Sequence, residues 1–172
     1  MTKARRVGSI NLGVDISKDY STVQVANIEV DNHADTCYLG SNFRPAFITD
    51  QICEDQPYHT NYEAIKNVQV VSGSTTYDDF LTGRTFILTT HQALWFGSTM
   101  KNSLISLNQI RTNGIPLCDD HFDPNKKLGM EVFIDFGEEI HIPFVLDGIF
   151  CAIKTRVPTD NEMKSCMHID LT

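Results

Sequence analysis

Alternating apolar and polar residues follow one another along most of the chain after residue 20, a pattern typical of half-buried β-strands. The clearest example is TVQVANIEVD at 22–31, in which Val23 and Val25, and then Ile28 and Val30, alternate with one slip of phase. Such a slip predicts a β-bulge within the strand. On the same pattern, further strands are predicted at 37–40, 46–48, 67–73, 84–90, 93–96, 130–136, 140–148 and 149–157.

Two short helices are predicted between these strands. LNQIRTNG at 107–114 has helical spacing and ends in an Asn-Gly pair, and glycine readily adopts the left-handed conformation that follows a last helical turn. Thr159, with Glu162 three residues later, forms the sequence signature of a capping box at the start of a helix over 160–166. The chain is therefore predicted to be mainly β, with one or two short helices.

Other segments lack a regular period. Residues 1–20 are polar and weakly periodic, which indicates a tail or a loosely attached strand. Residues 41–66 contain two prolines and many polar residues, so apart from the short edge strand at 46–48 they are predicted to be loop. Turn-like sequence is found at 75–83 and loop-like sequence at 121–129.

Composition narrows the class of protein and its partners. The 172 residues, 41% of them apolar, suffice for one globular domain with an appendage. A net charge of −8 is opposite in sign to the footprint of a nucleic-acid-binding domain, so DNA and RNA binding are not expected. No run of about 18 apolar residues occurs, so no membrane span is expected. The cysteines, Cys37, Cys53, Cys118, Cys151 and Cys166, are odd in number and irregularly spaced, which indicates reduced thiols in the cytoplasm.

The segment VDNHADTCYLG at 30–40 has the most informative chemistry in the chain. A strand brings the carboxylate of Asp31 to a tight turn of polar and small residues, and a second short apolar strand follows. This layout resembles the active-site turn of the retroviral-type aspartic proteases (retropepsins), whose pattern is apolar-D-S/T-G-A-D/S-x-x-x-V/L. The matching positions are occupied by Val30, Asp31, Ala34, Asp35 and Leu39.

A second stretch strengthens the resemblance. ALWFG at 93–97, followed by LISLNQI at 104–110 and by Gly114, is similar to the copia-type retrotransposon protease pattern of an apolar VLYVP strand, then NLLSVSQL, a short helix and a glycine. The two motifs occur in the order found in that family. The resemblance therefore extends over 23–114, to the protease domain of a copia-type retrotransposon polyprotein.

The resemblance implies a mainly β fold, namely a retropepsin-like (acid protease) half of a β-barrel with one short helix. The chain then divides into an N-terminal tail over 1–20, a retropepsin-like domain over 21–115 and a β-rich C-terminal extension over 116–172. The extension would either complete the barrel or link the domain to the next part of the polyprotein.

The same resemblance implies a function and a site. Asp31 would be the catalytic aspartate, Asp35 and Ala34 would contact the substrate, and Asn32 and His33 would complete the active-site turn. Two copies of the chain would form a homodimer whose paired aspartates activate a water molecule. The substrate would be the parent polyprotein, cleaved in the cytoplasm or within virus-like particles, with the hairpin at 70–90 closing over it. No cofactor is expected.

Two residues of the turn differ from the family pattern. Asn32 and His33 stand where the family has Ser or Thr and then Gly. An imidazole needs room at a position where glycine allows the two turns of a dimer to approach closely. The alternative is therefore a catalytically inactive retropepsin-like domain that serves as a dimerisation or peptide-binding module. A third hypothesis is an unrelated small β-domain in which Asp31 is a turn residue.

The segment also contains residue types that serve in metal binding and in cysteine catalysis. His33, Asp35 and Cys37 alternate along the chain and would share one face of a strand. Three ligands from one strand are poorly placed for a tetrahedral metal, so no metal site is predicted. Cys37 as a nucleophile, with His33 or His91 as its base, is disfavoured because residues two or four apart on a strand rarely align as a catalytic pair.

Overall fold

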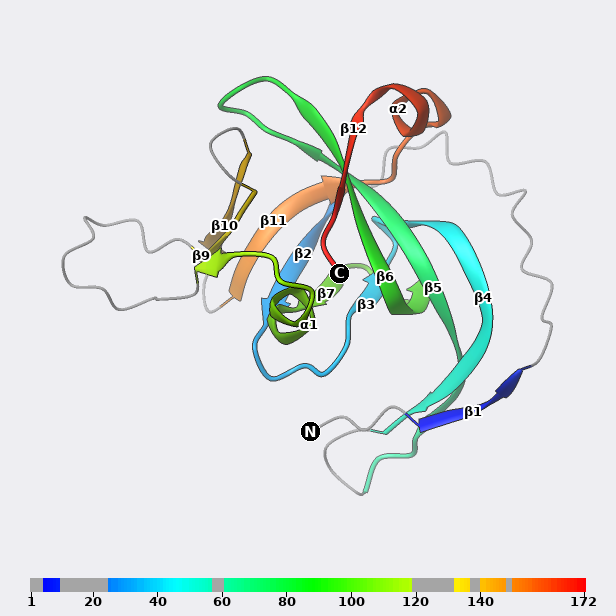
Figure 1. The fold of residues 1–172 in the computed structure, drawn as a ribbon. Coiled ribbons are helices and arrows are strands. Elements are labelled where there is room, and N and C mark those ends of the chain that lie inside the picture. The colour runs from blue at the N-terminus through cyan, green and yellow to red at the C-terminus, as the bar shows by residue number, and fades with distance from the viewer. Residues whose placement is uncertain (1–4, 10–24, 57–60, 119–131, 137–139, 148–149) are drawn as a thin grey trace, which may run out of the picture.

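The computed structural model describes residues 5–9, 25–56, 61–118, 132–136, 140–147 and 150–172. Within them the chain is mainly β, with a mixed sheet and two short helices (Figure 1). The strands are β1 (Arg5–Ser9), β2 (Val25–Asp31), β3 (Tyr38–Gly40), β4 (Arg44–Asp55), β5 (Ile65–Asp78), β6 (Thr85–Gly97), β7 (Ser103–Ser106), β8 (Leu117–Cys118), β9 (Val132–Asp135), β10 (His141–Asp147), β11 (Phe150–Arg156) and β12 (Met167–Asp170). The helices are α1 (Leu107–Thr112) and α2 (Asp160–Ser165).

The strand order of the sheet differs from the order of the strands in the sequence. Along the sheet the strands lie in the order β1-β4-β5-β6-β3-β7-β2-β11-β10-β9-β8, and β12 pairs with β6. Although β2 and β3 are consecutive in the sequence, β7 lies between them. β2 pairs with β7 in parallel, as β3 and β12 each pair with β6. Because β7 lies between β2 and β3, the ends of segments that are far apart in the chain come together.

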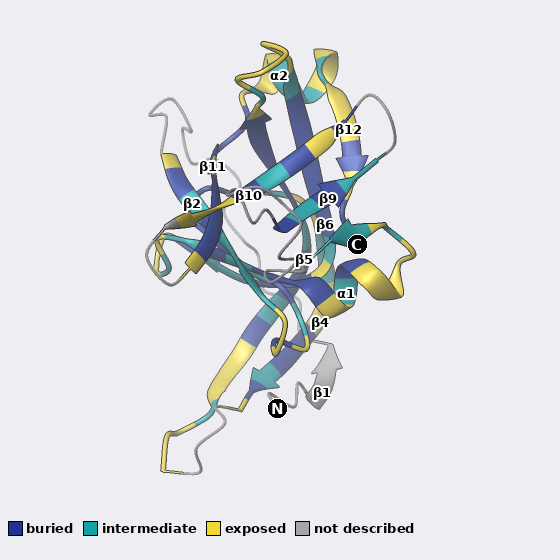
Figure 2. Ribbon diagram, turned by 90° about the vertical axis from the view of Figure 1, so that its left-hand side faces the viewer, coloured by how far each residue is buried: buried dark blue, intermediate teal, exposed yellow. Residues whose placement is uncertain are grey.

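One apolar core joins the middle of the chain to its C-terminal strands. Ile28, Leu39 and Ile105, from the three crossing strands, are fully buried. They share a cluster of buried side chains with Ile153 of β11 and Ile169 of β12. Figure 2 shows this burial as dark blue along β5, β6 and β11. Burial of one such aliphatic side chain stabilises the folded state by about 1.5–3 kcal/mol, so these positions contribute substantially to the free energy of folding.

Several predicted elements are confirmed. β2, β3, β9, β10 and β11 overlap the predicted strands, and α1 and α2 overlap the predicted helices. The capping box is present, because the Thr159 side chain accepts a hydrogen bond from the Glu162 amide and the Glu162 carboxylate accepts one from the Thr159 amide. The predicted loop at 121–129 and most of the predicted tail lie outside the described residues; β1, within that tail, pairs with β4.

The loop predicted over most of 41–66 is wrong, because β4 occupies much of it. The pairing of β4 with β5 shifts register three times, between Pro45 and Phe47, between Ile48 and Ile52, and between Cys53 and Asp55. Each irregularity changes which residues face the core, so the strand has no regular period of two to detect.

Two more boundaries are corrected on the next strands. The turn predicted over 75–83 is too long, since β5 continues to Asp78 with Thr75, Thr76 and Tyr77 buried. The separate strands predicted on either side of His91 form the single strand β6, which continues through an irregularity at that point. β12 is a strand that the pattern did not predict.

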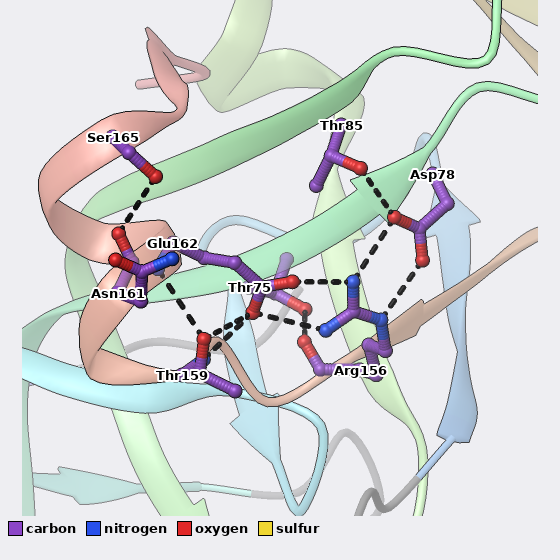
Figure 3. Close-up of polar contacts among 8 residues, drawn as sticks. All are labelled: Thr75, Asp78, Thr85, Arg156, Thr159, Asn161, Glu162 and Ser165. Atoms are coloured by element: carbon purple, nitrogen blue, oxygen red, sulfur yellow. Dashed lines mark hydrogen bonds and ion pairs between the residues drawn. The ribbon is translucent and has the colours of Figure 1, made fainter.

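A cluster of charged side chains fastens α2 to the sheet (Figure 3). The Arg156 guanidinium donates to both carboxylate oxygens of Asp78, with N–O distances of 2.8 and 3.0 Å. It also donates to both oxygens of Glu162, at 3.0 and 2.6 Å. Arg156 ends β11, Asp78 ends β5 and Glu162 lies on α2, so a single cation holds three elements in place.

Candidate active site

The two motifs of the sequence meet where β2 ends. β2 and β7 pair in parallel with Val30 opposite Ile105 and Asp31 opposite Ser106. Asp31 is the last residue of β2, and α1 begins directly after Ser106. The carboxylate of Asp31 therefore lies at a strand end, beside the start of a helix.

The first residues of α1 hold the turn that follows Asp31. The Ser106 hydroxyl donates to the carbonyl oxygen of Ala34 at 2.6 Å and also accepts the Gln109 amide as the helix N-cap. The Asn108 side chain donates to the carbonyl oxygen of Asn32 at 2.7 Å. Two backbone carbonyl groups of the turn are thus bonded by side chains from a segment about seventy positions later in the chain.

Gln109 extends this attachment to both neighbouring strands. Its side-chain oxygen accepts the Cys37 amide at 3.0 Å, and its side-chain nitrogen donates to the carbonyl oxygen of His91 at 3.0 Å. These roles of Ser106, Asn108 and Gln109 were not predicted. The signal for two of them was present, because Ser106-x-x-Gln109 is a capping-box pattern at the start of a helix.

The carboxylate of Asp31 is accessible and is oriented by its own turn. Its side chain is 39% exposed, and Oδ1 accepts the backbone N–H of His33 at 2.7 Å. The Nδ1 atom of His33 lies 3.7 Å from the same oxygen, and the His33 side chain is 89% exposed. The turn therefore presents an aspartate and an imidazole together on the surface.

The other residues predicted for the site divide into two groups. Asn32 and Asp35 are exposed beside Asp31. Ala34 is 5% exposed, and its carbonyl oxygen is occupied by the bond from Ser106, so it supports the turn from beneath. The structure brings all of these residues into one loop, with the polar side chains outward.

Cys37 is buried directly after the turn. Burial raises the pKa of its thiol to about 12, although the Ser106 amide, which donates to Sγ, opposes that shift. A thiol that stays protonated at neutral pH is a poor nucleophile, so the burial of Cys37 also disfavours it as a catalytic nucleophile. Among the described residues, no group of three His, Cys, Asp or Glu side chains lies close enough to hold a metal ion.

The expectation that the hairpin at 70–90 closes over Asp31 is wrong. Val25, at the start of β2, pairs with Arg156, which in turn binds Asp78 beside the β5–β6 turn. Asp31 lies at the opposite end of β2, about 20 Å away for a strand of this length. In Figure 1 the β5–β6 turn accordingly lies at the top, and the loop between β2 and β3 lies in the lower half.

The β4–β5 hairpin is the one that approaches the Asp31 side. Tyr38, the first residue of β3 after the turn, donates its hydroxyl hydrogen to Asp55 at 3.1 Å. Asp55 ends β4, so this end of β4 lies close to the first residue of β3 after the turn. Burial raises the pKa of the Asp55 carboxyl, and the bond from Tyr38 opposes that rise.

Comparison with protein-family models, with curated proteins and with solved structures gives no match to this chain. None of the helices in the described residues is long and apolar enough to cross a membrane. The function proposed for the Asp31 turn therefore depends on its chemistry and geometry and on its resemblance in sequence to a known motif.

Proposed function

We propose that the chain is a retropepsin-like aspartic endopeptidase of a copia-type retroelement, in which Asp31 is the catalytic residue. The observation that supports the proposal best is the meeting of the two sequence motifs at one point. The strand carrying Asp31 pairs with the strand of the second motif, and the helix of that motif holds the turn. An aspartate that served only as a surface turn residue would not require this attachment.

The proposed chemistry requires two copies of the chain. Two Asp31 carboxylates brought to a two-fold axis could not both ionise, so the pair would share one proton. The ionised carboxylate would take a proton from a water molecule, and the protonated one would polarise the scissile carbonyl. Asp31 and Asp35 are both accessible to solvent, and under this proposal Asp35 contacts the bound polypeptide. Under this proposal the substrate is the parent polyprotein, in the cytoplasm or in virus-like particles.

The decisive experiment is a cleavage assay with matched variants. Purified protein is incubated with a proteome-derived peptide library between pH 4 and 7, and new termini are identified by mass spectrometry. We expect cleavage that pepstatin inhibits and that Asp31→Asn reduces at least about 1,000-fold, since the variant loses the group that activates water. Asp50→Asn, an exposed aspartate on β4, is the control and should cleave as the wild type does.

A second candidate function is a retropepsin-like domain without activity, which binds a peptide or a second copy. The observation that favours it is the exposed imidazole of His33. This side chain lies on the turn that two copies would bring together, where the family pattern has glycine. Sedimentation velocity separates the candidates. A dimer without cleavage supports the inactive module, and a cleaving dimer supports the protease. A monomer that neither cleaves nor binds any peptide of the library contradicts both.

A further inference from the structure

A second group of reactive side chains lies apart from the Asp31 turn. Ser72 of β5, His91 of β6 and Asp170 of β12 converge on one face of the sheet. The Ser72 hydroxyl lies 2.8 Å from Nδ1 of His91, and Asp170 Oδ1 lies 3.3 Å from Nε2 of the same ring. A nucleophile, a base and a carboxylate that orients the base are thus in contact in series.

The contacts determine which ring nitrogen holds the proton. The Asp170 carboxylate can only accept, so neutral His91 must donate from Nε2 and leave the lone pair on Nδ1 free. Nδ1 then accepts the Ser72 hydroxyl hydrogen. This is the arrangement that prepares a serine for attack, because the proton it must lose already points at the base. The ring is used with its nitrogens exchanged relative to the chymotrypsin pattern, and either nitrogen can serve as a base.

The backbone at His91 is irregular in a way that places its side chain. Val71 pairs with Ala93 and Gly73 pairs with Thr90, so Ser72 faces both His91 and Gln92 in a β-bulge. Gln92 has a φ of 50°, a left-handed conformation that a residue other than glycine rarely adopts. Bulges redirect side chains, and strained backbone of this kind is concentrated at functional sites.

The peptide groups on either side of the bulge are held from two directions. Thr172 accepts the His91 amide at 2.8 Å and donates to the His91 carbonyl oxygen at 3.1 Å through the same hydroxyl. The side chain of Gln109 donates to that carbonyl oxygen as well. The imidazole therefore projects from a fixed backbone, which preserves its distance to Ser72.

The group is open to small molecules and has an apolar neighbour. The side chains of His91 and Asp170 are 44% and 70% exposed. Phe47 of β4 pairs directly with Ser72, is 65% exposed, and shares its face of the sheet, since opposite residues of an antiparallel pair point to the same side. A ligand with an aromatic or short aliphatic group could therefore pack on Phe47 while its reactive atom faced Ser72.

We infer that Ser72, His91 and Asp170 form a hydrolytic triad that acts on small esters with an apolar acyl or aryl group. The Ser72 oxygen attacks the ester carbonyl carbon while its proton moves to Nδ1 of His91, and Asp170 keeps its bond to Nε2. Collapse of the tetrahedral intermediate breaks the ester C–O bond, and the leaving alcohol takes the proton from Nδ1. Water then attacks the acyl-serine by the same route in reverse and releases the acid.

The inference is tested with a fluorophosphonate probe and with p-nitrophenyl butyrate. We expect one covalent adduct, mapped to Ser72 by peptide mass spectrometry, and none in Ser72→Ala. His91→Asn should slow labelling by about 100-fold and Asp170→Asn by about 10-fold, as expected for loss of a general base and of its orienting group. Phe47→Ala should raise KM for the butyrate ester while kcat stays unchanged.

Controls keep the result independent of folding and of Asp31. Ser165→Ala, which changes an exposed serine on α2, should label as the wild type does, and thermal melting should show each variant folded. Asp31→Asn and pepstatin should leave ester hydrolysis unchanged, so failure of the protease proposal does not affect this one. An adduct at any other residue, no adduct in the folded wild type, or equal labelling of His91→Asn would each overturn the triad.

Discussion

The turn after Asp31 and the cluster around Arg156 both place carboxylates at strand ends, and they use them in opposite ways. Asp78 and Glu162 surround one guanidinium, with every carboxylate oxygen bonded to it. Asp31 accepts a backbone N–H through one oxygen and is 39% exposed. The first two carboxylates are occupied in holding elements together, whereas the third is oriented but available.

The pKa values of the cluster follow from the same difference. The hydrogen bonds from Arg156 lower the pKa of Glu162 to about 2 and lower that of Asp78 as well, although partial burial of each carboxyl opposes the shift. A carboxylate stabilised to this extent contributes to folding and is of little use as a proton acceptor. Carboxylates that support the fold and carboxylates that do chemistry can thus be distinguished by what their oxygens contact.

Arg156→Ala should have the largest effect on stability. It leaves two carboxylates close together without their cation, and it releases α2 and the end of β5 from β11, so a loss of about 3 kcal/mol in the free energy of unfolding is expected. Urea denaturation followed by circular dichroism measures it. Lys154→Ala, an exposed position two residues earlier on β11, is the control and should change stability by less than about 0.5 kcal/mol.

Acidification should weaken the cluster in a defined range of pH. Because the folded pKa of Glu162 is about 2 and the ordinary value is 4.5, its contribution is complete above pH 4.5 and is lost as the pH falls toward 2. The free energy of unfolding should drop by about 1–3 kcal/mol across that interval. Glu162→Gln should flatten this part of the profile, and an unchanged slope in that variant would contradict the assignment.

Removing the attachment of the Asp31 turn should have an intermediate effect. Gln109→Ala deletes the partner of the Cys37 amide and one of the two side-chain donors to the His91 carbonyl oxygen, and should cost about 1–2 kcal/mol. Asn108→Ala is the matched control, since it removes one exposed bond to Asn32 and should cost less than about 0.5 kcal/mol. Equal losses in the two variants would show that the hydrogen bonds of Gln109 stabilise the fold no more than the exposed bond of Asn108 does.

Asp31→Asn should have the smallest effect on stability, and this would distinguish Asp31 most clearly from the carboxylates that hold the fold together. The asparagine side-chain oxygen can accept the His33 amide as the carboxylate does, and both residues suit a turn. A change within about 0.5 kcal/mol in the free energy of unfolding is expected. A larger loss would indicate that Asp31 supports the fold, and the comparison with Asp78 would then fail.

Local features of the chain were predictable because their causes are local. The alternation around Ile28 identified β2, and the Thr159–Glu162 pair identified the start of α2, since both depend on residues within one turn or one strand. The turn after Asp31 was likewise visible as short polar residues between two apolar segments. What these patterns report is which face of a segment is buried and where the segment stops.

The partners of those segments were decided by the tertiary structure. The bulges of β4 and the bulge at His91 interrupt the period of two, so the sequence pattern predicts loop where β4 lies and two strands where β6 is one. The contact of Gln109 with Cys37, and the convergence of Ser72, His91 and Asp170, join residues that no local pattern relates. Hydrogen bonding between remote strands depends on how the strands are ordered in the sheet and packed on the core, and only the folded chain satisfies all of those pairings at once.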